Sequence, residues 1–115
     1  MALVLNSRMN RGVVVLSADG RLDAEAAPAL LAACESHSAR GDCQIVLDLA
    51  GVAYVDSKGI EAILAIFQLV GKAGGLRLIG ARPQLLQLLE ITRLARILGI
   101  AADETAAIDS LVGSD

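Results

Sequence analysis

The chain has 115 residues, of which 55% are hydrophobic and 2% aromatic, and its formal net charge is -3. This hydrophobic fraction excludes a disordered chain, because disorder requires low hydrophobicity together with high net charge. The shortage of aromatic side chains argues against a surface that stacks nucleic-acid bases, and the negative charge gives no general attraction to phosphate backbones. We therefore expect one domain, residues 1–115, with an aliphatic core and no nucleic-acid partner.

The predicted elements alternate between short apolar strands and longer segments with helical spacing. In chain order they are strand 3–5, strand 13–16, helix 24–38, strand 45–49, helix 57–72, strand 76–79, helix 84–91, strand 97–101 and helix 103–112. Asp19-Gly20 is typical of a turn after the second strand, and Asp23 stands at the N-cap position of the first helix. Pro83 stands at the first position of a later helix.

The order of these elements predicts the fold class. Strands that alternate with helices run parallel, whereas the first two strands have no helix between them and should pair antiparallel. The strand IVLDL, residues 45–49, is apolar almost throughout, which predicts burial on both faces of the sheet. We expect an α/β fold with a small mixed sheet of four to five strands and helices packed mainly on one side.

Cysteine usage and apolar runs indicate a cytoplasmic protein. Cys34 and Cys43 have the spacing of neither a redox pair nor a metal site, and we expect both to be reduced. We expect no secretion signal in residues 1–12 and no membrane insertion, since the longest apolar run, residues 60–70, is too short to span a bilayer. No cofactor is expected.

The polar step Asp56-Ser57 between two apolar segments is the strongest candidate site. Catalysis by Ser57 is disfavoured, because His37 is the single histidine, no nucleophile-elbow motif surrounds Ser57, and the adjacent Lys58 points in a different direction. The carboxylates that a metal would need lie in separate segments. A phosphoacceptor role for Asp48, as in receiver domains, lacks the acidic pair and the late lysine that such domains use.

Two interpretations of Ser57 stay open on physical grounds. As a helix N-cap its hydroxyl would accept a hydrogen bond from the first turn of the helix. As a phosphorylation site it would place about two negative charges at the positive end of the helix dipole, changing the surface without unfolding the domain.

Three segments of the chain carry a family resemblance: Gly20-Arg21-Leu22-Asp23, IVLDLAGVAYVDSKGIEAIL and GGLRLIGARPQLLQLLEITRLARIL. Together they resemble the STAS domain, and more narrowly the bacterial anti-sigma-factor antagonists. The resemblance covers residues 13–111, and its most specific part is Asp-Ser-x-Gly at residues 56–59. It implies that a partner, which is both anti-sigma factor and serine kinase, phosphorylates Ser57 and thereby ends binding, and that a serine phosphatase restores it. We expect a non-enzymatic module, a monomer or weak dimer.

The resemblance also implies a partner-binding face and one departure from the family. The residues expected on this face are Asp23, Asp56, Ser57, Lys58, Gly59, Glu61 and Ala62. The family usually has Ser, Thr or Ala where this chain has Lys58, a cation that could neutralise a phosphate on Ser57 or disturb recognition by the kinase. The alternative function is a STAS docking subunit of an ABC-type lipid transporter or of a stress-signalling complex.

The helix after Ser57 is apolar on nearly all sides, which indicates burial on two sides. Residues 60, 63, 64, 67 and 70 form the stripe expected to face the sheet. The second stripe includes Ala62, Ile66 and Leu69. Either neighbouring helices cover this stripe, or it stays partly exposed as a patch for a partner or for self-association.

Overall fold

The computed structural model describes residues 3–42, 44–70 and 75–113, and within them a four-stranded sheet forms the centre of the fold. The strands lie side by side in chain order: β1 (Val4–Asn10), β2 (Val13–Leu22), β3 (Ile45–Val55) and β4 (Leu76–Ile79). β1 pairs antiparallel with β2, whereas the β2–β3 and β3–β4 pairs are parallel. The predicted mixed sheet with an antiparallel first pair is thus confirmed.

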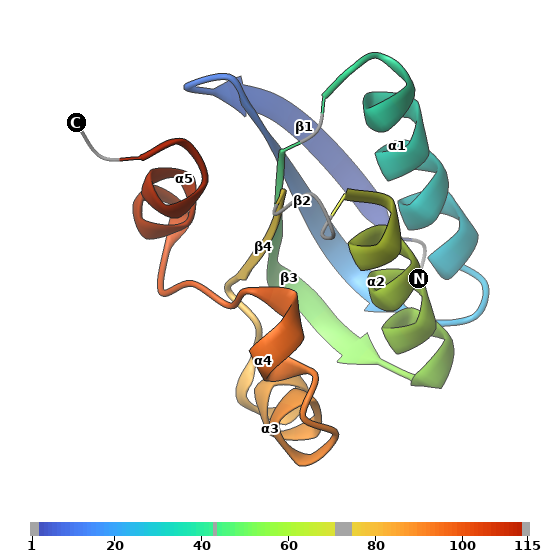
Figure 1. Cartoon of the computed structure of the whole chain (residues 1–115). Helices are drawn as coiled ribbons and strands as arrows, with labels where there is room; N and C mark the ends of the chain where they lie inside the picture. Colours follow the sequence, from blue (N-terminus) through green and yellow to red (C-terminus); the bar gives the residue numbers. More distant parts are fainter. Residues whose placement is uncertain (1–2, 43, 71–74, 114–115) are drawn as a thin grey trace.

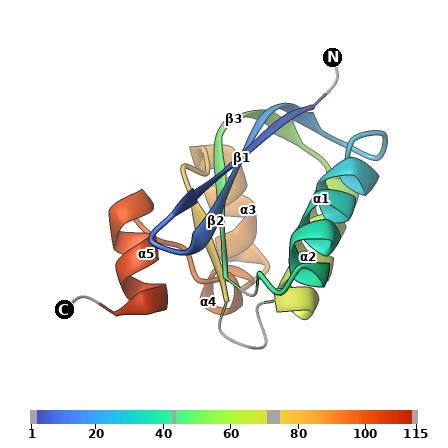
Figure 2. The same ribbon diagram turned by 90° about the horizontal axis from the view of Figure 1, so that it is seen from above.

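Helices cover the two faces of this sheet unequally. α1 (Ala27–Ala39) and α2 (Ser57–Val70) lie side by side on one face, and α5 (Glu104–Val112) lies on the other (Figures 1 and 2). α3 (Pro83–Ile91) and α4 (Ala95–Leu98) follow β4 and lie beyond its end. The larger core lies under α1 and α2, and it also takes residues from α3 and α4.

The alternation of side chains along the strands explains why two cores form. Val14 and Leu16 of β2 belong to the larger core, while Val13 and Val15 belong to the smaller core beneath α5. In β3, Val46 faces the smaller core between two residues that face the larger one. Successive strand residues point to opposite faces, so a continuous apolar run needs a cover on each side. The expected burial of the IVLDL strand on both faces is confirmed.

The first three strands are longer than the sequence predicted: β1 covers residues 4–10 and not 3–5, β2 covers 13–22 and not 13–16, and β3 covers 45–55 and not 45–49. Asp19-Gly20 was predicted as a turn but continues β2, where Gly20 has a φ of 121° and the pairing with β3 shifts register on either side. Register shifts of this kind, as at a β-bulge, bend a strand without ending it. The strand predicted at residues 97–101 is also wrong, because Gly99 ends α4 in the left-handed conformation and Ile100 makes only an isolated bridge to Leu78.

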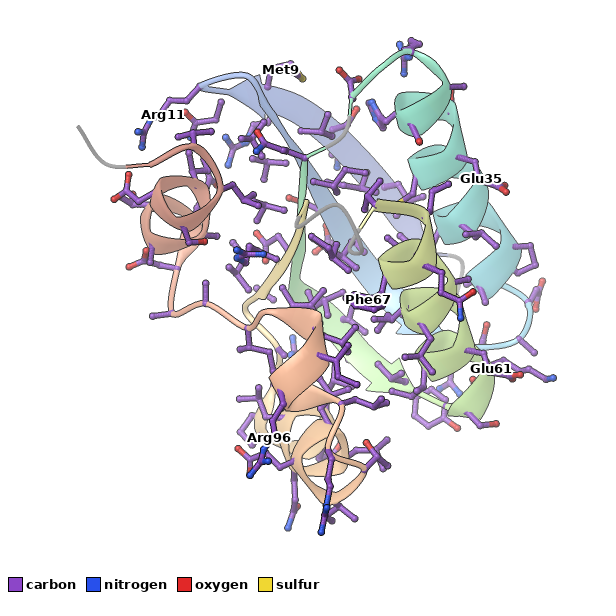
Figure 3. All side chains as sticks on the ribbon, viewed as in Figure 1. Met9, Arg11, Glu35, Glu61, Phe67 and Arg96 are labelled. Carbon is purple, nitrogen blue, oxygen red and sulfur yellow. The ribbon has the colours of Figure 1, made fainter. Side chains whose placement is uncertain are left out.

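Ion pairs fasten α5 to the β1–β2 hairpin. Arg8 and Asn10 of β1 both donate hydrogen bonds to the carboxylate of Glu104, and Arg11 in the hairpin pairs with Asp109 at 2.5 Å (Figure 3). Asp103 is the N-cap of α5 and accepts a hydrogen bond from Ala106 N at 2.8 Å. The helix that covers the second face is therefore held by polar contacts around a small apolar centre.

Among the described residues, no helix is long and apolar enough to cross a membrane. Cys34 is a free, fully buried thiol of α1, and Cys43 lies outside the described residues. Pro83 is the first residue of α3, as predicted.

Candidate functional site

The ends of two parallel strands bring the two sequence markers of the site together. Leu22, the last residue of β2, pairs with Val55, the last residue of β3. Asp56 follows and donates its backbone N–H to the Leu22 carbonyl oxygen at 3.2 Å. Asp23 comes directly after Leu22, so the turn before α1 and the start of α2 meet at one edge of the sheet.

Asp56, and not Ser57, is the N-cap of α2. Its Oδ1 accepts hydrogen bonds from the backbone N–H groups of Lys58, at 2.9 Å, and Gly59, at 3.0 Å, and its carbonyl accepts from Ile60 at 3.1 Å. A short side-chain acceptor at this position satisfies helix N–H groups that have no partner within the helix. The N-cap interpretation of Ser57 is wrong: Ser57 is the first residue of the helix, and it is exposed.

Gly59 lets the first turn of α2 approach the end of β2 closely. A Cβ on Gly59 would overlap the carbonyl oxygen of Leu22 and would stand 2.9 Å from Leu22 Cγ and 3.0 Å from Val55 Cγ1. No ordinary side chain fits such a distance without displacing backbone. The glycine therefore fixes where Ser57, two residues earlier, stands relative to the sheet.

Lys58 and Glu61 form an ion pair on the exposed side of α2. Lys58 Nζ lies 3.2 Å from Glu61 Oε2, and the two side chains are equally exposed, each at 62% (Figure 3 labels Glu61). Ser57 and Glu61 are four residues apart and therefore neighbours on the helix surface. The three side chains form one small polar surface, in which a cation and an anion already balance each other.

Asp23 shapes the loop that adjoins this surface. The sequence predicted Asp23 as the N-cap of a helix that starts at residue 24, but α1 begins at Ala27 and Asp23 does not cap it. Its Oδ1 instead accepts a hydrogen bond from Ala26 N at 3.0 Å, in the turn before the helix. Its other oxygen lies 3.7 Å from Nε of Arg21, whose guanidinium stands 4.3 Å above the ring of Tyr54. Asp23 thus contacts Arg21 at the end of β2 and Ala26 just before α1.

The sequence analysis did not select Arg21 or Tyr54. The two residues are direct partners across β2 and β3, a pairing that depends on two register shifts. The register shifts could not be read from the sequence, so the contact between these side chains could not be either. The exposed aromatic ring at the end of β3 is nevertheless a detectable signal, because Tyr54 is the single tyrosine of the chain.

Of the two alternatives for the second stripe of α2, burial holds for two of its three residues and partial exposure for the third. Ile66 is completely buried and Ala62 is 4% exposed, while Leu69 is 40% exposed. The buried stripe of α2 is Gly59, Ala62, Ile63, Ile66 and Val70. Ile63 and Val70, from the stripe expected to face the sheet, are thus buried, while Ile60, Leu64 and Phe67 of that stripe are partly buried and pack against the larger core.

Ala62 contributes to the wall of a groove between α1 and α2. The groove has a volume of about 300 Å³ and is lined by Ala24, Ala27, Pro28, Leu31, Lys58, Glu61, Ala62 and Ala65. It brings Lys58, Glu61 and Ala62 of the expected partner face together with the start of α1. Three of the seven residues expected on the partner face thus line this groove.

His37 would have to act as the general base if Ser57 were a catalytic nucleophile. It lies in the last turn of α1, and its Nδ1 is 3.3 Å from Oδ2 of Asp42. The groove beside Ser57 is lined by the first turns of that helix, so His37 lies at the opposite end. Among the described residues, no group of three or more His, Cys, Asp or Glu side chains gathers as metal ligands would.

Comparison with known proteins shows the class to which this fold and site belong. The sequence profile of the STAS domain matches residues 5–107, and the chain is a member of the STAS domain family. The anti-sigma F factor antagonist of Paenibacillus polymyxa is 27% identical over 113 residues, which are 96% of this chain and 97% of that protein.

Two solved structures have the same fold. An anti-sigma factor antagonist from Mycobacterium paratuberculosis superposes with a TM-score of 0.85 at 24% identity, over 95% of this chain and 93% of that one. The anti-sigma factor antagonist SpoIIAA in its unphosphorylated form superposes with a TM-score of 0.74 at 21% identity, over 96% of this chain and all of the other.

Proposed function

We propose that this protein is an anti-sigma-factor antagonist of the cytoplasm, which binds an anti-sigma factor through the surface around Ser57 and so releases a sigma factor. Family membership and the similarity to the Paenibacillus polymyxa antagonist, which extends over nearly the whole of both chains, support this function. The protein acts by binding and supplies no chemistry of its own. The anti-sigma factor is also a serine kinase, phosphorylation of Ser57 ends the binding, and a serine phosphatase reverses it.

The observation that carries the proposal is the division of roles at the start of α2. Asp56 makes the capping hydrogen bonds, Gly59 makes the close contact with β2, and Ser57 between them is exposed. The hydroxyl of Ser57 is therefore available to a kinase without loss of the cap. A switch residue needs this arrangement, because its modification should change the surface and leave the fold intact.

The charges around Ser57 explain how phosphate would end binding. The cap already uses the N–H groups of Lys58 and Gly59, so a phosphate on Ser57 would not replace those hydrogen bonds without displacing Asp56. It would instead add about two negative charges between the carboxylates of Asp56 and Glu61, with Lys58 as the adjacent cation. The surface formed by Asp56, Lys58 and Glu61 would change from weakly to strongly acidic, and a partner that binds the unmodified surface would be repelled by the phosphorylated one.

The experiment combines the purified protein with each anti-sigma factor kinase encoded in the same genome, with and without ATP. We expect a stable complex without ATP, and with ATP a single phosphate on Ser57 by mass spectrometry together with loss of the complex. Ser57→Ala should bind and take no phosphate, while Ser57→Asp should bind about tenfold more weakly or worse.

Three outcomes separate the parts of the proposal. A complex that forms but carries phosphate at another residue would refute the role of Ser57 and keep the antagonist function. If the protein binds none of these anti-sigma factors, the antagonist function is refuted. Co-purification with a transport ATPase from cells would then support the alternative role as a STAS docking subunit.

A further inference from the structure

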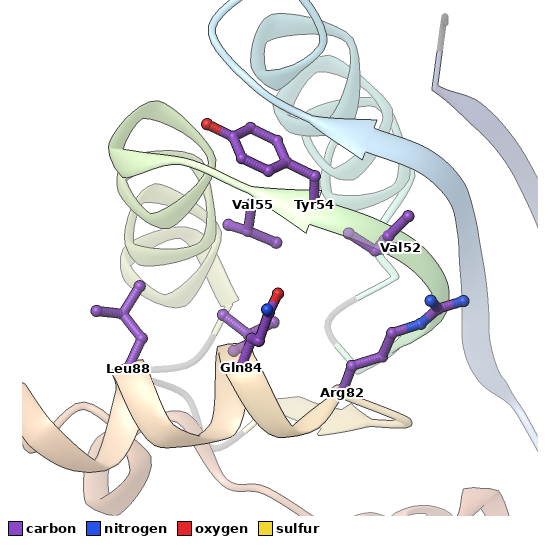
Figure 4. Close-up of a pocket in the computed structure, with 8 residues that line it drawn as sticks. Val52, Tyr54, Val55, Arg82, Gln84 and Leu88 are labelled. Carbon is purple, nitrogen blue, oxygen red and sulfur yellow. The ribbon is translucent and has the colours of Figure 1, made fainter.

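A cleft separates the last residues of β3 from the first turns of α3 (Figure 4). Its volume is about 120 Å³, and it is lined by Val52, Ala53, Tyr54, Val55, Arg82, Gln84, Leu85 and Leu88. In Figure 4, Val55 on the strand and Leu88 on the helix extend toward each other, and Arg82 lies where the helix begins. The cleft thus has apolar side chains from both elements, polar groups exposed beside them and a cation at one end.

The apolar lining is partly open to solvent. Val52 and Leu85 are 4% and 6% exposed and form the floor, whereas Leu88 at the rim is 39% exposed. Concave apolar surfaces with a half-exposed aliphatic rim are where a partner's anchor side chain gains most on binding, because both surfaces lose water there. The space is small, so it suits a single side chain and not a helix.

The charge of the lining selects the partner. The lining contains Arg82 and no acidic residue, although the chain as a whole is acidic. Arg82 Nε donates to the carbonyl oxygen of Ala50 at 3.2 Å, which holds the side chain along the edge of β3. A held guanidinium at the end of an apolar cleft is complementary to a carboxylate beside an apolar side chain.

The cleft also adjoins the proposed switch. Val55 is the last residue of β3, Asp56 caps α2, and Ser57 follows. A partner that covers Ser57 therefore reaches the cleft on one side of it and the α1–α2 groove on the other. Lys58 and Glu61 line that groove and neutralise each other. The groove therefore does not favour a partner of either charge.

We propose that the β3–α3 cleft is an anchor site for the anti-sigma factor, which inserts one aliphatic side chain between Val55 and Leu88 and places an adjacent carboxylate against Arg82. This inference rests on the proposed function and identifies a second contact that does not depend on the phosphorylation state of Ser57. It gives the antagonist a means to select partners by an apolar residue next to an acidic one.

The test uses two matched pairs of variants and the anti-sigma factor kinases of the same genome as probes. Leu88→Gln is compared with Val112→Gln, since these side chains are 39% and 40% exposed, one in the cleft and one at the end of α5. Arg82→Glu is compared with Arg96→Glu on α4. By titration calorimetry without ATP, Leu88→Gln should weaken the Kd about tenfold, and Arg82→Glu should weaken it similarly and reduce its salt dependence, while both controls stay within about twofold.

The outcomes distinguish this proposal from the function on which it rests. If the wild type binds and Leu88→Gln binds equally well, the anchor site is refuted and the antagonist function stands. A loss of the same size in Val112→Gln would also refute it, because the effect would not belong to the cleft. If the wild type binds none of these proteins, both proposals fail. If circular dichroism shows that Leu88→Gln does not fold, Leu88→Ala takes its place in the same comparison.

Discussion

The α-carbon of Gly59 lies against the carbonyl oxygen of Leu22, in a space that admits no Cβ. In the interior of an exposed helix, replacement of glycine by alanine normally stabilises a protein by roughly 0.5 to 1 kcal/mol. Here Gly59→Ala should destabilise it by about 1 to 3 kcal/mol, because α2 must move away from β2 to make room for the methyl group. Urea unfolding measures this free energy. A stability equal to or above that of the wild type would show that the close contact does not constrain the helix.

Asp56 and Ser57 should contribute unequally to stability, although they are adjacent. Asp56→Ala removes the acceptor for two backbone N–H groups and should cost about 1 kcal/mol of unfolding free energy. Ser57→Ala changes an exposed residue and should stay within about 0.5 kcal/mol of the wild type. Asp103→Ala, which removes the cap of α5, is the matched control and should cost about as much as Asp56→Ala. A larger loss from Ser57→Ala than from Asp56→Ala would contradict this assignment of the cap.

The site shows which features the sequence could predict and which it could not. The location of the site, between a buried strand and a helix that starts with Asp-Ser-x-Gly, follows from local pattern and resemblance, because both depend on consecutive residues. The sequence does not determine which residue caps the helix. Asp56 and Ser57 are both good capping residues, and a shift of the helix start by one residue decides between them.

Features that depend on contacts between distant segments were predicted least well. α2 has apolar residues on nearly all sides, so its sequence left both burial and exposure open for Ile66, which is completely buried. The register shifts that carry β2 through Asp19-Gly20 depend on pairing with β3. The α/β class, the mixed sheet and Pro83 at the start of α3 were predicted correctly, because periodicity and local backbone preference determine them.

Lys58 should reduce the strength of the switch at Ser57. Its ammonium group is adjacent to the site of the added charge, so part of the charge introduced by Ser57→Asp is neutralised. In a Lys58→Ser background, the loss of partner affinity caused by Ser57→Asp should be about two- to threefold greater than in the wild-type background. Calorimetric titration of the four proteins measures both losses.

Salt provides the control for this effect. Raising the NaCl concentration from about 0.05 M to about 1 M should remove most of the difference between the two backgrounds, because screening acts strongly on exposed charges. Equal losses in both backgrounds at low salt would show that Lys58 does not interact with charge at residue 57. Lys58 would then be an ordinary surface residue paired with Glu61.

Glu104 should make the attachment of α5 sensitive to acid. The hydrogen bond from Arg8, with a further one from Asn10, lowers the pKa of the Glu104 carboxyl. Because the pKa is lower in the folded state, this stabilisation is present above the unfolded value of about 4.3 and is lost as the pH falls through the folded value. Glu104→Gln should lower the Tm at pH 7 by about 2 to 4 °C and flatten the decline of Tm between about pH 5 and pH 3. Glu90→Gln on α3 is the control, and equal acid profiles for the two variants would contradict the prediction.

The thiol of Cys34 should be unreactive until the protein unfolds. Burial raises its pKa to about 12, and the charge of Glu35 adds to the effect. Because the unfolded thiol titrates near 8.5, the unfolded chain loses its proton first as the pH rises, and this thiol's contribution to stability declines above about pH 8.5. In a Cys43→Ser background, iodoacetamide at about pH 8 should modify Cys34 only in urea, since the thiolate is the reactive form. Mass spectrometry counts the adducts, and rapid modification of the folded protein would contradict the burial of this side chain in the core beneath α1.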